Sequence, residues 1–311
     1  MMNSSRFCPP ELAPPKSYNR RQFNRLSARL GLALATGASL GAHRPASADI
    51  DLQEGYASGD GVRLYYVRTG EGPLIVFLHG FPDTWRLYRP YLLEFGQDHL
   101  AVAPNLRGVH PSAQPEADVA YAMPRLLGDL HDLLDHLGRQ SCTLVANDWG
   151  AYIAWVFASA YPDRVERLVI MNGGHPALLL RDFRGSRAQI AASQYERPAA
   201  VGPGPHAAYL RADPIKVPAS LEEAAELPVP DLADAFFGGA ARPPASTSLV
   251  VEVPTLVIWG MKDPFQLPGL LDGLDAYVTD LTLLRVEDAG HYPMRTHREE
   301  VTQAIRRFLK A

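Results

Sequence analysis

The sequence predicts an α/β fold: a mostly parallel central sheet with helices on both faces and an inserted, shortened, mainly helical cap. Three observations predict it. Short continuous apolar runs, typical of strands buried on both faces, alternate with helical patterns. One run ends in a small residue, any residue, an acid, any residue and glycine, and an apolar helix follows at once. The alternation stops for a proline-rich stretch and then resumes, which indicates an insertion.

The predicted core begins with a strand pair. Residues 52–57 and the alternating residues 62–67 flank a turn at residues 58–61, as in a hairpin. The apolar run at residues 73–78 predicts a buried strand, and the loop His79-Gly80-Phe81-Pro82 follows it. Because glycine and proline just beyond a buried strand favour a fixed, tight loop, this loop can direct backbone N–H groups.

The other core elements alternate along the chain. We expect a helix near residues 87–95, a strand at 99–103, an amphipathic helix at 124–137, a strand at 142–145, a helix at 151–161 and a strand at 165–171. After the interruption we expect a strand at 254–260, a helix at 267–277, a strand at 281–286 and a last helix at 299–309. His131 and His136 lie five residues apart on different faces of their helix, so we expect a solvated face and no metal site.

This pattern divides the chain into a leader, a core and a cap. Residues 49–172 and 254–311 form the predicted α/β core, and residues 173–253 form the predicted cap. The cap is rich in proline and has short helical patches at residues 178–195, 220–226 and 232–237.

Residues 1–48 read as an export signal. They contain seven basic residues and one acidic residue, and Asn19-Arg20-Arg21-Gln22-Phe23 resembles the twin-arginine export signature. A weakly apolar stretch, too short and too interrupted for a stable membrane anchor, leads to Ala46-Ser47-Ala48, a cleavage pattern. The order of these parts predicts export by the twin-arginine (Tat) machinery to the periplasm or the medium. A disordered basic tail is the alternative.

Composition narrows the possible functions. The chain is 47% hydrophobic and 21% charged, which is typical of a folded domain. Its formal charge is −4, and loss of the basic leader would make it more acidic, so a nucleic-acid partner is not expected. Cleavage would also leave Cys142 as the single cysteine, so the exported chain would have no internal disulfide. The oligomeric state does not follow from these numbers.

The acid in the turn after residues 142–145 is Asp148, between Ala146 and Gly150. This is the pattern of a nucleophile elbow, in which serine is the familiar central residue. An aspartate is already an anion at neutral pH. Its attack on a carbonyl would give an anhydride, whereas attack on a tetrahedral carbon gives a stable ester. Asp148 therefore predicts displacement at an epoxide or carbon–halogen bond. An ordinary helix N-cap is the alternative.

Further polar residues follow other buried strands and are expected at the same sheet edge. Asp263 follows the run at 254–260, and His291 lies beyond the next strand. His291 is the expected base for hydrolysis of the ester, and Asp263 would orient it. The N–H groups of Phe81 and Trp149 are expected to form the oxyanion hole. Asp288, three residues before His291, is a rival orienting residue.

These motifs together resemble the α/β-hydrolase-fold epoxide hydrolases, which are related to haloalkane dehalogenases. The matching segments are His79-Gly80-Phe81-Pro82, Asp148-Trp149-Gly150, Trp259-Gly260-Met261-Lys262-Asp263 and Ala289-Gly290-His291. The resemblance implies covalent hydroxyalkyl-enzyme catalysis without a cofactor. One departure is Ala146-Asn147, where these enzymes often have Gly-His.

The resemblance also implies that cap tyrosines polarise the epoxide oxygen. Ser193-Gln194-Tyr195 resembles the segment with the first tyrosine. Tyr209-Leu210-Arg211 resembles the segment with the second, but strict alignment places Leu210 at the acidic position and Tyr209 one residue early.

We therefore expect a hydrolase that opens a small apolar epoxide to a vicinal diol with water as the second substrate. Asp148, Asp263, His291, Tyr195 and Tyr209 are the candidate catalytic residues. The alternatives are a haloalkane dehalogenase with the same nucleophile and a non-catalytic binding or signalling protein on this scaffold.

Overall fold

The structure is a computed structural model that describes residues 51–311 except 60, 198–203, 214 and 238–247. The predicted leader at residues 1–48 lies outside the described residues. Within them, an eight-stranded sheet has the order β1-β2-β4-β3-β5-β6-β7-β8. The strands are β1 (Gln53–Gly59), β2 (Val62–Thr69), β3 (Leu74–Leu78), β4 (Leu100–Pro104), β5 (Cys142–Asn147), β6 (Val165–Met171), β7 (Thr255–Gly260) and β8 (Leu281–Val286).

The sheet is parallel from β4 to β8, while β1 pairs with β2 and β2 with β4 in antiparallel fashion. Every residue of β3, β5 and β7 is buried, as expected for strands covered on both faces. Successive side chains of β5 separate by face: Leu144 and Ala146 belong to one hydrophobic cluster, and Val145 belongs to the other.

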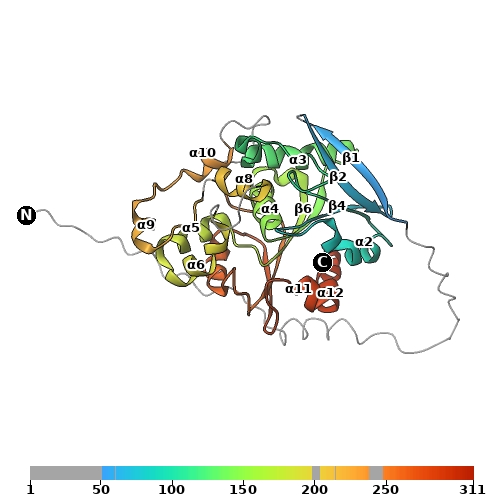
Figure 1. Cartoon of the computed structure of the whole chain (residues 1–311). Coiled ribbons are helices and arrows are strands. Elements are labelled where there is room, and N and C mark those ends of the chain that lie inside the picture. Colours follow the sequence, from blue (N-terminus) through green and yellow to red (C-terminus); the bar gives the residue numbers. More distant parts are fainter. Residues whose placement is uncertain (1–50, 60, 198–203, 214, 238–247) are drawn as a thin grey trace, which may run out of the picture.

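Helices cover both faces of the sheet (Figure 1). The cluster with Val145 contains residues of α2 (Arg89–Phe95) and α12 (Arg298–Lys310), and α11 (Pro293–Thr296) adds Met294. The cluster with Leu144 contains residues of α3 (Met123–His136) and α4 (Trp149–Ala160). The predicted α/β architecture is confirmed.

The segment between β6 and β7 contains α5 (Pro176–Gly185), α6 (Arg187–Ala192), α8 (Pro205–Ala212), α9 (Leu221–Glu226) and α10 (Leu232–Phe237). Figure 1 shows these helices grouped to one side of the sheet. The single helical patch expected at 178–195 is divided at Ser186, whose side chain caps α6 by accepting the Gln189 N–H. Helix α8 was not expected from the sequence.

Short turns of 3-10 helix complete the described part of the chain. They are η1 (Trp85–Tyr88), η2 (Asp118–Tyr121), η3 (Pro162–Arg164), η4 (Gln194–Glu196), η5 (Pro268–Leu271) and η6 (Leu274–Ala276). The helix expected at 267–277 is wrong, because Gly273 adopts a left-handed conformation (φ 79°) between η5 and η6 and ends the helical path.

The solvated face expected for the two histidines of α3 holds for His136, which is exposed, but is wrong for His131. The His131 ring is buried against the rings of Phe157 and Tyr161, at centroid distances of 5.1 and 4.2 Å. His136 lies 3.1 Å from the Tyr66 hydroxyl. Among the described residues, no group of three or more histidines, cysteines or acids is placed to hold a metal ion. None of the helices in those ranges is long and apolar enough to cross a membrane.

Candidate active site

Asp148 stands at the junction of β5 and α4 in a conformation that few residues adopt. Its φ is 53° and its ψ is −124°. Such backbone strain costs roughly 1 to 3 kcal/mol and persists only where the surroundings fix it. Close packing fixes it here: a Cβ on Gly150 would lie 2.4 Å from the Leu78 carbonyl oxygen. The elbow therefore needs glycine at this place and presents Asp148 at the edge of the sheet.

Two backbone N–H groups stabilise the Asp148 carboxylate. The Phe81 N–H donates to Oδ1 at 2.9 Å, and the Trp149 N–H also hydrogen-bonds the carboxylate. Both were predicted as oxyanion-hole donors. Burial raises the pKa of Asp148. His291 and these two N–H groups together lower it by more, so the pKa lies below its ordinary value. Asp148 is therefore an anion at neutral pH although it is buried.

His79 holds the loop that carries Phe81. Its Nε2 accepts the Leu106 N–H at 3.1 Å, so Nδ1 carries the proton and donates to the Gly80 carbonyl at 2.8 Å. Burial lowers the pKa of His79 to about 4, so the ring is neutral. The predicted supporting loop, with Gly80 and Pro82, is thus fixed from within the protein.

His291 lies between the two predicted acids. Its Nδ1 is 2.7 Å from Asp263 Oδ2, and its Nε2 is 3.4 Å from Asp148 Oδ2. The structure therefore brings together the three residues that the sequence analysis placed after separate strands. The rival Asp288 is exposed and pairs with His297 at 3.2 Å instead.

Asp263 is fixed by several donors. Its Oδ1 accepts the N–H groups of Phe265 (2.8 Å) and Gln266 (3.0 Å), and its Oδ2 also accepts Asn172 Nδ2 at 2.7 Å. Sequence reasoning missed Asn172, which directly follows β6 and has a φ of 43°. A polar residue just beyond a buried strand was the available signal.

The pKa of His291 reflects two opposing effects. Burial alone lowers it, but hydrogen bonds and charge from Asp148 and Asp263 raise it to about 10. The imidazole is therefore protonated at neutral pH beside the ionised Asp148. A change that removes the charge of Asp148 removes one of the two effects that raise this pKa.

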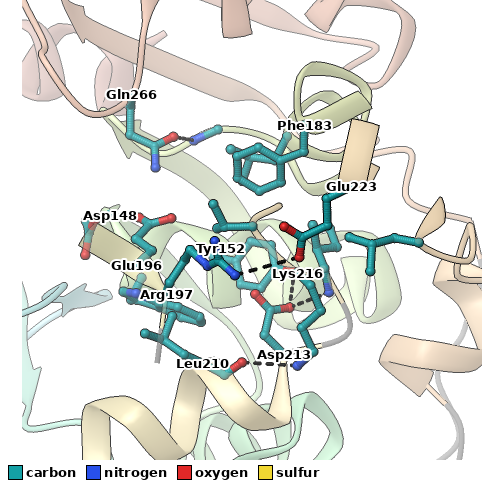
Figure 2. Close-up of a pocket in the computed structure, with 16 residues that line it drawn as sticks. Asp148, Tyr152, Phe183, Glu196, Arg197, Leu210, Asp213, Lys216, Glu223 and Gln266 are labelled. Carbon is teal, nitrogen blue, oxygen red and sulfur yellow. Dashed lines mark hydrogen bonds and ion pairs between the residues drawn. The ribbon is translucent and has the colours of Figure 1, made fainter. Parts of the chain in front are cut away.

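A cavity of about 270 Å³ opens in front of Asp148 (Figure 2). Much of its wall is apolar, with Leu179, Phe183, Leu210, Ile215 and Val217 among the lining residues. Its polar lining includes Tyr152, Glu196, Asp213, Lys216 and Gln266, none of which was predicted as a site residue. A second cavity of about 360 Å³ is lined by the His79 loop and Tyr209. Trp149 lines both cavities.

The two tyrosines predicted as acids lie in different places. The Tyr209 hydroxyl is buried and donates to the Arg107 carbonyl at 2.6 Å, while Leu210 lines the cavity of Asp148. Neighbouring residues of a helix point about 100° apart, so Tyr209 and Leu210 line different cavities. The structure thus places Tyr209 outside the lining of the Asp148 cavity, against the rings of Tyr121 and Trp149.

Tyr195 is closer to the predicted machinery. Its hydroxyl donates to Glu196 Oε1 at 2.7 Å. Its ring packs on Phe265 at a centroid distance of 4.8 Å, and Phe265 packs on His291 at 5.3 Å.

Comparison with known proteins supports the fold and the nature of the site. Residues 73–216 match the family described as alpha/beta hydrolase fold. Epoxide hydrolase 3 of Xenopus tropicalis is 30% identical over 299 residues, covering 83% of this chain and 78% of that protein. Epoxide hydrolase 1 of Caenorhabditis elegans is 30% identical over 281 residues, covering 80% and 68%.

Solved structures agree with these sequence matches. The epoxide hydrolase of Bacillus megaterium in complex with an inhibitor has a TM-score of 0.65 and 29% identity over 83% of this chain and 100% of that one. An epoxide hydrolase from metagenomes of hot environments has a TM-score of 0.68 and 30% identity, with coverage of 84% and 98%. The chain therefore belongs to the epoxide hydrolase family of the α/β-hydrolase fold.

Proposed function

We propose that this chain hydrolyses a small, largely apolar epoxide to a vicinal diol through a covalent ester on Asp148. The observation that carries the proposal is that the two Asp148 oxygens have different partners. Oδ1 accepts the Phe81 N–H at 2.9 Å, while Oδ2 lies 3.4 Å from His291 Nε2. One oxygen is thus held by the Phe81 N–H, and the other faces the imidazole and is the one we assign to attack.

In the first step, Asp148 Oδ2 attacks an epoxide carbon and the C–O bond of the ring breaks. The product is an ester whose carbonyl oxygen is Oδ1, still in contact with the Phe81 N–H, and the Trp149 N–H lies beside the same group. Donors placed before the reaction stabilise the later oxyanion without reorganisation. The apolar cavity wall supports a largely apolar substrate.

The second step needs His291 as a base. The ester is neutral, so the charge of Asp148 that raises the pKa of His291 is lost when the ester forms. The imidazole can then release its proton to solvent and take one from the water that attacks Cγ of the ester. Asp263 remains on Nδ1 and stabilises the imidazolium that results. Collapse of the tetrahedral intermediate passes the imidazolium proton to the leaving oxygen and releases the diol with the former Oδ2. His291 regains its original proton from solvent as the Asp148 carboxylate forms again.

A single turnover in heavy-oxygen water tests this route. We expect the label in the Asp148 carboxylate first and an unlabelled diol, because the attacking water enters at Cγ. Label in the first diol would reject the covalent ester. Halide release from haloalkanes without turnover of epoxides would favour the dehalogenase, and an unchanged phenotype of Asp148→Asn would favour a binding or signalling role.

We also propose that residues 1–48 direct twin-arginine export to the periplasm or the medium. Support comes from the order of the basic, apolar and small-residue parts and from Cys142, which is buried and free. A chain that needs no disulfide can fold before export. Replacing Arg20 and Arg21 by lysine should leave the uncleaved precursor in the cytosol of the host. Equal export of this double variant would contradict the proposal.

A further inference from the structure

The tyrosine hydroxyls around the nucleophile already donate to protein acceptors. The pairs are Tyr195 with Glu196 Oε1 (2.7 Å), Tyr152 with Asp213 Oδ1 (2.9 Å), Tyr209 with the Arg107 carbonyl (2.6 Å) and Tyr292 with the Phe81 carbonyl (3.4 Å). A group that donates its proton to the protein must break that bond before it can donate to a substrate. The proton for the leaving oxygen therefore needs another source.

Glu196 is such a source by position. It lines the same cavity as Asp148, and Figure 2 shows the two side chains next to each other. The Tyr195 hydroxyl donates to Oε1, and among the described residues the other carboxyl oxygen makes no hydrogen bond. Phe265 contacts both Tyr195 and His291, so Glu196 and its neighbour lie at the catalytic end of the cavity.

The surroundings of Glu196 favour its neutral form. Burial of the carboxyl group raises its pKa most, the charge of Asp148 raises it further, and it reaches about 8. Asp213 also raises it, while the Tyr195 hydroxyl and His291 lower it. Arg197 and Glu223 form an ion pair at 3.7 Å on the cavity wall, and Lys216, also in the lining, donates to the carbonyls of Leu210 and Arg211. These cations are thus engaged elsewhere.

A second donor lines the same cavity. Gln266 Oε1 accepts the Gly174 N–H at 3.2 Å, which sets the orientation of the carboxamide. Figure 2 shows the amide nitrogen directed into the cavity, on the side where Asp148 and Glu196 lie. The amide of Gln266 is therefore placed to donate to an oxygen in the cavity.

We propose that Glu196, as a carboxylic acid, protonates the epoxide oxygen while Asp148 opens the ring, with the Gln266 amide as a second hydrogen-bond donor to that oxygen. The proposal rests on the function proposed above and identifies its acid. The Asp148–carbon bond forms, the carbon–oxygen bond breaks, and the oxygen takes the Glu196 proton. After water has hydrolysed the ester, the proton released by the regenerated Asp148 carboxyl group returns to Glu196. The sum is epoxide plus water to diol.

Tyr195 is a positioning residue in this scheme. Its hydroxyl holds Oε1 of Glu196 and thereby turns the other oxygen to the substrate. Because this hydrogen bond also lowers the pKa of Glu196, removing it should move the titration of the acid to higher pH.

The test is the rate of Asp148 alkylation, followed by rapid quench and intact mass with styrene oxide over pH 6 to 10. We expect the wild-type rate to fall above about pH 8 and Glu196→Gln to be slower by roughly a hundredfold with no such fall. Tyr195→Phe should keep most of the rate and move the fall to higher pH. Gln266→Leu should be slower by about tenfold with the fall unchanged, since one neutral donor is worth about that much.

Glu222→Gln is the matched control, because Glu222 is an exposed glutamate of α9 paired with Arg187. It should behave as the wild type. Infrared spectra give a readout independent of activity: a protonated carboxyl band that disappears above pH 8 in the wild type and is absent in Glu196→Gln. Alkylation by Glu196→Gln at the wild-type rate, or a hundredfold loss in Tyr195→Phe, would overturn the proposal. Absence of any Asp148 adduct in the wild type would instead refute the epoxide hydrolase function itself.

Discussion

Asn172 Nδ2 donates to Asp263 Oδ2 at 2.7 Å, the same carboxylate oxygen that lies 2.7 Å from His291 Nδ1. The Oδ1 of Asn172 in turn accepts the Gly260 N–H at 2.9 Å. The side chain therefore ties the end of β6 to the end of β7 and fixes Asp263 in the orientation that holds the imidazole. This relationship gives the first prediction.

Asn172→Ala should slow hydrolysis of the ester more than its formation, because Asp263 orients the base of the second step. A hydrogen bond to a charged group is worth roughly 1.5 to 3 kcal/mol, which corresponds to about a ten- to hundredfold loss. Single-turnover rates of the two steps measure the difference. Equal slowing of both steps would show that Asn172 acts on the fold as a whole.

His291→Gln should trap the covalent ester. Asp148 keeps the Phe81 and Trp149 N–H groups and can still attack, but no base remains for the attacking water. We expect the protein mass to rise by the mass of one epoxide and to stay there for many wild-type turnover times. His297→Gln is the control, since His297 pairs with the exposed Asp288, and it should turn over normally. A variant without any adduct would mean that His291 is needed for ring opening as well.

These residues differ in how far the sequence could predict them. Asp148, Asp263 and His291 each follow a buried strand, and the parallel sheet places such residues at one edge. Asn172 has the same position after β6, but its amide is neither a nucleophile nor a general acid or base, so the sequence alone does not mark it as a site residue. The site residues of the cap were harder to predict from the sequence. A shift of one residue along α8 decides that Leu210 and not Tyr209 lines the Asp148 cavity. Glu196 becomes notable only through burial, which depends on how the cap packs.

Gly80→Ala should damage the site without damaging the core. A Cβ at Gly80 would lie 2.2 Å from Asp148 Oδ1, so the loop or the carboxylate must move. A displacement of about 1 Å in a reacting group can cost on the order of a hundredfold in rate. Gly128→Ala in α3 is the matched control, because nothing lies within 4 Å of its added Cβ. It should keep its activity and gain up to about 1 kcal/mol in stability. Similar kcat/KM values for the two variants would contradict this view of the loop.

The His291 ion pair should make stability depend on pH in the alkaline range. The pKa of His291 is raised from 6.5 to about 10 in the folded chain, so the folded chain binds the proton more tightly than the unfolded chain. This stabilising contribution is complete below pH 6.5 and is lost as the pH rises through about 10. Urea unfolding at pH 6 and pH 10 should show a smaller loss in His291→Gln than in the wild type. The same loss in both proteins would show that other groups dominate.

The charge of Asp148 should control the pKa of His291, since this coupling turns the imidazole from a cation into a base during the reaction. Asp148→Asn imitates the neutral ester in charge. It removes one of the two carboxylates that raise the pKa of His291 and leaves Asp263 on Nδ1, while burial continues to lower it. We therefore expect the pKa of His291 to fall from about 10 toward the neutral range in Asp148→Asn, as measured by NMR titration of the ring carbons. Asp288→Asn, a change at an exposed acid that does not contact His291, should leave it where it is. If the pKa stays near 10 in Asp148→Asn, Asp263 alone holds the proton, and His291 cannot activate water at neutral pH in the way proposed.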